Sequence, residues 1–210
     1  MSRRSELLHA AVLIGALAAL AAAGQADIPT PEVEARRVVQ STIDDVLGIL
    51  RNPSLPQQAK KDDVEQIAYQ RFDFVLISRL VLAQNWSRFS PQQQEEFVEA
   101  FKKHLSATYR DTLDNFRDEK ITIENARLEP KGDVTVMTVV RGETGDTKVD
   151  YRMRKLPDGW RGIDVIVEGV SLVQNFRSQT QEILSTESPD ALIRRLREKQ
   201  IKDVAPKGKG

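Results

Sequence analysis

The spacing of the apolar residues changes near Asp118, and no other feature of the sequence limits the fold as much. Between Pro31 and Phe116 apolar residues recur every three or four positions, which is the period of an amphipathic helix. Between Ile121 and Val167 they alternate with polar residues, which is typical of strands with one buried face. Helices before this point and strands after it predict an α+β domain, with helices packed on the apolar face of an antiparallel sheet.

Most of the predicted helices begin at residues that cap helix ends. A side-chain oxygen before the first turn accepts a backbone N–H, and proline suits the first helical position. Gln93 and Gln174 each follow a capping serine by three residues, the spacing of a capping box. These starts are Thr30-Pro31, Asp73, Ser90-Pro91, Ser171 and Ser188-Pro189, and a further helix is marked by Val64, Ile67 and Ala68.

The start at Ser90 opens the longest predicted helix. Apolar residues continue at helical spacing from Phe97 to Phe116. At a rise of 1.5 Å per residue, a helix from Pro91 to Phe116 would be about 39 Å long. We therefore expect it to bend or to wrap around the domain.

Four strands are predicted in the second half of the chain, joined by short links that contain glycine or proline. They are Ile121–Leu128, Val134–Arg141, Lys148–Lys155 and Trp160–Val167. Short links favour hairpins, so the strands should form an antiparallel meander. Gly162 interrupts the alternation of the fourth strand, which predicts a β-bulge.

The N-terminus has the pattern of a secretory signal peptide over residues 1–26. Arg3 and Arg4 precede an uncharged run from Leu7 to Ala26, which ends in small residues before Asp27. An uncleaved membrane anchor is the alternative, because the run approaches the length that spans a bilayer. We expect a single mature domain over residues 27–203 in a bacterial periplasm, followed by a disordered tail over 204–210.

Charge and composition exclude several functions. The chain has 31 basic and 31 acidic residues, so no general field attracts nucleic acid, and no nucleic-acid partner is expected. It has no cysteine, which excludes disulfides, thiolate chemistry and a lipid-anchoring cysteine. Outside the predicted signal peptide His104 is the one histidine, and its neighbours Lys102 and Lys103 favour a solvated position.

No catalytic or metal-binding residues are predicted, and no cofactor. The chain has neither a Gly-x-Ser-x-Gly elbow nor a glycine-rich phosphate loop between a strand and a helix. Asp150 and Asp164 alternate with Arg152, Arg154 and Arg161 on neighbouring strands. Cross-strand ion pairs on the wet face of the sheet explain these carboxylates better than a catalytic pair does.

Apolar side chains therefore remain as the material for a binding site. By patterning alone they form a packed core, and only a sheet that curves away from its helices would leave a cavity. They are Phe97, Phe101, Leu105, Tyr109, Val149, Tyr151, Met153, Ile163, Val165, Val167, Val173 and Phe176.

Several motifs resemble those of the MlaC family, also called toluene-tolerance or Mla phospholipid-binding proteins. The strand that ends in Glu168-Gly169-Val170-Ser171-Leu172 and continues into Asn175-Phe176-Arg177-Ser178-Gln179 is the most specific of them. The others are Phe72-Asp73-Phe74, Leu82-Ala83-Gln84-Asn85-Trp86, Ser90 to Phe97, Phe101, Tyr109, Tyr151-Arg152-Met153-Arg154 and Gly159-Trp160. The resemblance extends from about Val33 to Leu196.

The resemblance implies a four-stranded antiparallel curved sheet packed with several helices around an apolar lipid pocket. The twelve apolar residues named above then become lipid-binding residues that contact the acyl chains. It also implies a periplasmic carrier that passes phospholipid between an outer-membrane lipoprotein–porin complex and an inner-membrane ABC transporter with an MCE-domain subunit. Such a carrier maintains the lipid asymmetry of the outer membrane and holds phospholipid as cargo.

Two other functions stay open at this stage. A small-pocket periplasmic enzyme acting on an apolar substrate would require His104 beside a carboxylate inside a cavity. An adaptor or chaperone with a closed core would bind other envelope proteins through its surface and would have no pocket.

Overall fold

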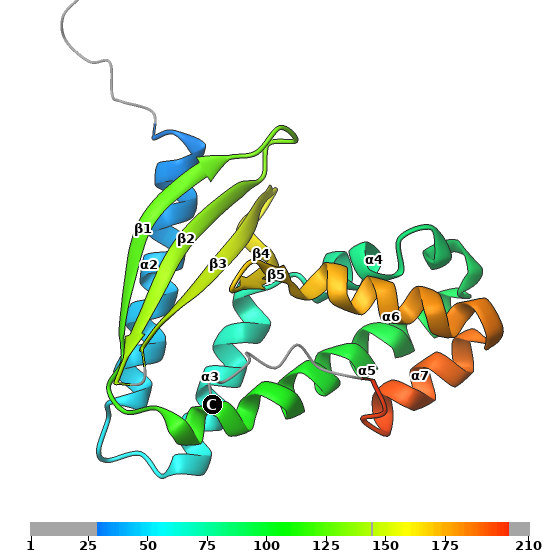
Figure 1. The fold of residues 1–210 in the computed structure, drawn as a ribbon, viewed down its shortest axis with the longest axis horizontal. Coiled ribbons are helices and arrows are strands. Elements are labelled where there is room, and N and C mark those ends of the chain that lie inside the picture. Colours follow the sequence, from blue (N-terminus) through cyan, green and yellow to red (C-terminus); the bar gives the residue numbers. More distant parts are fainter. Residues whose placement is uncertain (1–28, 144, 202–210) are drawn as a thin grey trace, which may run out of the picture. The chain divides into compact units, whose positions relative to one another are not determined.

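The computed structural model describes residues 29–143 and 145–201, and the described residues from Pro31 onwards belong to one unit (Figure 1). Its α-helices are α2 (Pro31–Leu50), α3 (Gln57–Arg71), α4 (Phe74–Leu82), α5 (Pro91–Tyr109), α6 (Leu172–Thr186) and α7 (Pro189–Arg197). Two 3₁₀ segments are η1 (Ala83–Arg88) and η2 (Arg110–Asn115). The predicted signal peptide over 1–26 and the predicted tail over 204–210 lie outside the described residues.

The predicted helix caps are confirmed at four helices. The side chain of Asp73 accepts the N–H of Leu76 at the start of α4. Ser90 and Gln93 form a complete capping box, in which each side chain accepts the backbone N–H of the other residue. The hydroxyls of Ser171 and Ser188 likewise accept N–H groups at the starts of α6 and α7. Capping depends on neighbours three residues away, so the sequence is sufficient to predict it.

The strands form one antiparallel sheet in the order β1-β2-β3-β4-β5. They are β1 (Lys120–Leu128), β2 (Val134–Gly142), β3 (Gly145–Leu156), β4 (Gly159–Val167) and β5 (Val170–Ser171). The sheet is curved and open, and it has five strands rather than the four predicted. Glu168 and Gly169 both have positive φ, so the chain turns back and pairs two residues with β4. Strand β5 was not predicted because two residues are too few to show the alternation of apolar and polar side chains.

The predicted bulge at Gly162 is confirmed. The register of β3 against β4 shifts between Arg152 and Met153, which pair with Asp164 and Gly162. The ring of Phe72 lies against Gly162, where a Cβ atom would come within 2.5 Å of the ring. The backbone N–H of Asp73 also donates to the carbonyl of Gly162 at 3.1 Å. The missing side chain therefore lets the link between α3 and α4 dock on the sheet.

Two apolar clusters hold the fold. One joins α2 to the sheet, and Figure 1 shows α2 running across one face of β1 and β2. The other joins α4, α5, α6 and α7, and its most buried aromatic residues are Phe97, Phe101 and Phe176. The helices are therefore divided between the face of the sheet and a helical layer beside β4.

Two predictions about α5 are wrong. The predicted helix from Pro91 to Phe116 ends as an α-helix at Tyr109, and the tighter turn of η2 follows. His104 is 2% exposed instead of solvated, and its ring contacts the ring of Phe176 edge-on at 5.7 Å. Each residue of a helix is rotated by about 100° from the one before, so the side chains of neighbouring lysines point away from His104.

Candidate functional site

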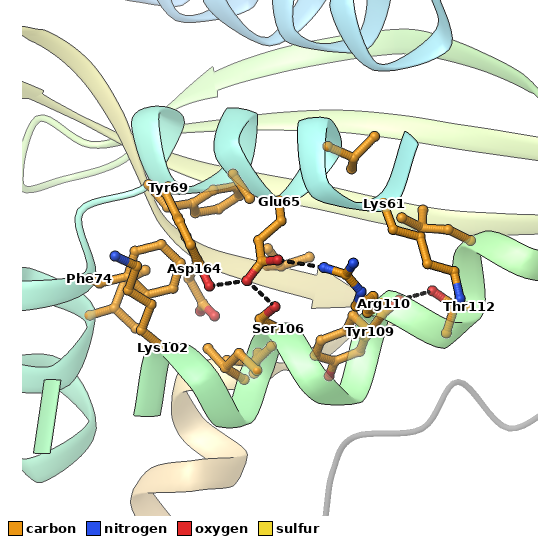
Figure 2. A pocket seen from close by; sticks show the side chains of 18 of the residues that line it. Lys61, Glu65, Tyr69, Phe74, Lys102, Ser106, Tyr109, Arg110, Thr112 and Asp164 are labelled. Carbon is orange, nitrogen blue, oxygen red and sulfur yellow. Dashed lines mark hydrogen bonds and ion pairs between the residues drawn. The ribbon is translucent and has the colours of Figure 1, made fainter. Parts of the chain in front are cut away.

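A cavity of about 250 Å³ lies between α3 and α5, with α4, β4 and α6 completing its wall (Figure 2). Its apolar lining is Val64, Ala68, Tyr69, Phe72, Phe74, Ile77, Leu105, Tyr109, Leu113, Val165, Leu172 and Val173. Its polar lining is Lys61, Glu65, Lys102, Ser106, Arg110, Thr112 and Asp164. An apolar interior with a few polar groups suits a ligand that is mostly hydrocarbon and carries one polar end.

A group of polar side chains, which we call the polar seam, joins α3 to α5 and η2 along the wall of this cavity. Its members are Asp62, Glu65, Tyr69, Ser106 and Arg110. Glu65 Oε1 accepts from Ser106 Oγ at 2.5 Å and from the Tyr69 hydroxyl, while Glu65 Oε2 accepts from Arg110 Nη1 at 2.6 Å. Arg110 also pairs with Asp62. Figure 2 shows the side chain of Glu65 reaching across to Ser106 and Arg110.

The polar seam keeps its acid ionised and its phenol neutral. Burial opposes the charge of Glu65, but the hydrogen bonds from Ser106 and Tyr69 and the charge of Arg110 outweigh it, so the pKa of Glu65 lies below 4.5. Burial raises the pKa of Tyr69 above 10.0, and its hydrogen bond to Glu65 adds to the increase. At neutral pH the seam therefore holds an intact carboxylate–guanidinium pair.

Further polar contacts lie at the two ends of the polar seam. Near the start of α3, Asp114 accepts from Lys61 Nζ at 2.6 Å and from Gln57 Nε2 at 3.1 Å. The hydrogen bond from Lys61 is the main cause that lowers the pKa of Asp114. At the other end, the ammonium group of Lys102 lies 3.9 Å from the centre of the Tyr69 ring. A cation over an aromatic face is a favourable contact.

Asp164 is the buried acid of the cavity wall. Its side chain accepts from Ser171 Oγ at 2.5 Å and from the N–H of Val173 at 3.0 Å, so it caps α6 from β4. It is 3% exposed, which corrects the expectation that it belongs to a wet face. The predicted pair with Arg152 exists at 3.7 Å. Arg154 and Arg161 pair instead with Asp133 and Asp158.

The cavity contains four of the twelve predicted lipid-binding residues, Leu105, Tyr109, Val165 and Val173. Phe97, Phe101 and Phe176 lie in the closed helical core, and the rings of Phe101 and Phe176 are 5.0 Å apart. Tyr151 and Met153 belong to the cluster under α2, and Ile163 is buried. Val149 and Val167 pair with each other on β3 and β4. Contact of any of the twelve with lipid stays a prediction.

The sequence did not single out α3 as a wall of the cavity. Val64, Ala68 and Tyr69 of α3 line it, yet α3 has no buried residue. A helix that is polar around most of its surface gives only a weak periodic signal. The i, i+4 spacing of Val64 and Ala68 was the one available indication.

The geometry also bears on the two alternative functions. His104 is absent from the cavity lining and packs against Phe176, whereas the enzyme hypothesis requires it inside the cavity. The adaptor hypothesis predicts a closed core without a pocket, whereas the structure has a cavity of about 250 Å³. Within residues 29–143 and 145–201 no three His, Asp or Glu side chains gather where they could hold a metal ion. In the same ranges no helix combines the length and apolarity needed to cross a membrane.

This chain is similar to known proteins in fold and in sequence. The family model described as MlaC protein matches residues 40–198. The toluene tolerance protein ttg2D of Pseudomonas putida is 28% identical over 163 residues, which cover 73% of this chain and 74% of that protein. The structure of the phospholipid-binding protein from Ralstonia solanacearum, solved in complex with a phospholipid, matches with a TM-score of 0.71. Its sequence is 28% identical, and the match covers 80% of this chain and 98% of that one.

Proposed function

Because the chain belongs to the MlaC family, we propose that it is a periplasmic carrier that holds phospholipid in the cavity between α3 and α5. One observation carries the proposal: an apolar cavity lies in a fold that matches a protein solved with a bound phospholipid. Phospholipid is the cargo, so the proposed function needs no catalytic residue and no cofactor.

The physical problem that such a carrier solves is the exposure of acyl chains to water. A phospholipid with roughly 30 chain methylenes, at about 0.8 kcal/mol each, would lose on the order of 24 kcal/mol by leaving a membrane for water. Free diffusion between two membranes is therefore negligible. A protein that surrounds the chains with apolar side chains removes most of this barrier.

The lining suggests how the lipid is oriented. The acyl chains would lie against the apolar wall formed by Ala68, Leu105 and Val173, and the headgroup would lie toward the polar seam. Lys102 lies at one end of the seam and can approach a phosphate as a point charge. This orientation keeps the charged headgroup near water and the acyl chains in the apolar interior of the cavity.

The proposed route runs between the two membranes of a bacterial envelope. The partners are an outer-membrane lipoprotein–porin complex and an inner-membrane ABC transporter with an MCE-domain subunit, and the result is maintenance of lipid asymmetry in the outer membrane. Net transfer would follow from different affinities of donor, carrier and acceptor or from ATP used at the transporter.

Native mass spectrometry of protein purified from a periplasmic extract tests the carrier function. We expect a mass excess of one or two phospholipids that disappears on delipidation with organic solvent and returns after incubation with phospholipid vesicles. A protein that carries no phospholipid and acquires none from vesicles would refute the proposal.

A matched pair of variants tests the position of the cavity. Ala68→Trp places a large ring in the cavity and should lower the bound phospholipid at least tenfold. Gln66→Trp adds the same ring to an exposed position of the same helix and should leave lipid binding unchanged. Equal lipid content in the two variants would show that lipid binds elsewhere.

A further inference from the structure

Helix α3 differs from the other helices of the fold in how it is held. Each of α2, α4, α5, α6 and α7 buries several side chains, whereas α3 buries none. The apolar side chains of Val64 and Ala68 face the cavity. A helix whose apolar side chains are only half-buried opens at a lower cost than one that contributes to a closed core.

Polar contacts hold α3 against α5 and η2. The polar seam links the middle of α3 to Ser106 and Arg110, and Gln57 and Lys61 link its first turns to Asp114. These contacts are close to water, because the side chains of Glu65 and Arg110 are 23% and 21% exposed. Water can replace each bond when it breaks, so the contacts can open and reform without leaving a buried charge unpaired.

The opposite side of α3 is attached differently. Arg71 pairs with Asp45 of α2 at 3.1 Å, and the next residue, Phe72, has its ring on Gly162 of β4. The C-terminal end of α3 is thus anchored to α2 and the sheet. At the N-terminal end, Gln57 Nε2 donates to the carbonyl of Leu113 and to Asp114 of η2, and Lys60 Nζ donates to the carbonyl of Leu50 at the end of α2 at 2.6 Å.

The cavity is smaller than a bound phospholipid requires. About 250 Å³ is below the ~300–1,000 Å³ of pockets that enclose a drug-sized ligand, and a phospholipid is larger than such a ligand. The arrangement described here therefore admits only part of a phospholipid. Since α3 forms one wall and belongs to neither apolar cluster, its displacement enlarges the cavity without opening either core.

We propose that α3 is the lid of the lipid cavity and that the polar seam is its latch. The lid pivots at Phe72, and its N-terminal end separates from η2 when phospholipid enters or leaves. This inference rests on the proposed function, because it names the moving part of the same lipid site.

Cross-linking the N-terminal end of the lid to η2 is the direct test. The chain has no cysteine, so Gln57→Cys with Asp114→Cys introduces the only two thiols, both at exposed positions. A short bismaleimide then joins α3 to η2. The readout is transfer of a fluorescent phospholipid between phosphatidylethanolamine–phosphatidylglycerol vesicles and the protein, with the unlinked double variant as control.

We expect the cross-link to slow lipid uptake and release at least tenfold relative to the unlinked double variant. Equal rates before and after cross-linking would overturn the lid while leaving the carrier function intact. A wild-type protein that takes up no phospholipid would overturn both.

The latch is tested separately by Arg110→Gln, which removes the cation that joins Glu65 and Asp62. We expect amide hydrogen exchange in α3 to rise about tenfold, with the buried part of α5 unchanged. Glu187→Gln is the matched control, since it breaks a similar pair with Arg195, and neither residue lines the cavity. Exchange in α3 that is the same in Arg110→Gln and the wild type would overturn the latch.

Discussion

Replacing Gly162 with alanine should destabilise the protein by about 1–3 kcal/mol, the usual cost of overpacking an interior. A Cβ atom at Gly162 would lie 2.5 Å from Cε1 and 2.6 Å from Cδ1 of Phe72. Both distances are far inside van der Waals contact at about 3.5–4.0 Å, so the ring has to move. That ring packs against the helical core and lines the cavity, so its displacement disturbs both.

Urea unfolding of three variants separates this clash from other effects. Gly48→Ala in α2 is the matched control, since a Cβ atom there meets nothing within 4 Å and should stabilise the helix by about 0.5–1 kcal/mol. Phe72→Leu removes Cε1, the ring atom that would lie nearest to the new methyl group, and replaces the rigid ring with a smaller side chain. In that background Gly162→Ala should cost at least about 1 kcal/mol less than in the wild type.

Additive effects of Gly162→Ala and Phe72→Leu would refute the reasoning. So would a Gly162→Ala protein as stable as the wild type, because the geometry leaves no room for a methyl group unless the ring moves.

Three further predictions concern local contacts. Folding lowers the pKa of Glu65, so the ionised carboxylate stabilises the protein fully above about pH 4.5. This stabilisation is lost as the pH falls through the pKa that Glu65 has in the folded protein. The melting temperature should therefore fall less on acidification in Glu65→Gln than in the wild type. Asp164→Ala leaves the N–H of Val173 without its acceptor and should cost about 1–3 kcal/mol in urea unfolding, whereas an unchanged midpoint would contradict the capping role. Ser90→Ala removes the cap of α5 and should cost about 1 kcal/mol by thermal unfolding, with Ser87→Ala, which caps no helix, as the control.

Local features were the most predictable part of the fold. The caps at Asp73, Ser90, Ser171 and Ser188 lie where the sequence predicts them, because each depends on a side chain and an N–H a few residues away. The four long strands and the bulge at Gly162 were also predictable, because the alternation of apolar and polar residues along each strand is a local pattern.

The errors occurred where distant segments decide the environment. The lysine neighbours of His104 predict a solvated position, but the helical rotation and the ring of Phe176 place it in the core. The alternation along β4 predicts that Asp164 lies on the wet face, but the turn after β4 brings Ser171 and the start of α6 onto its carboxylate. Neither partner could be identified without the tertiary fold.

The sequence by itself determined the α+β class, the helix starts, the antiparallel order of the long strands and, through its motifs, the family. Those features depend on spacing and on short-range hydrogen bonds, which a linear pattern records. Only the tertiary structure decided which apolar residues close into a core, such as Phe97 and Phe101, and which face a cavity, such as Leu105 and Tyr109. Apolar residues have the same spacing along the sequence whether they lie in a closed core or line a cavity. Packing between elements decides whether such a side chain meets other side chains or empty space.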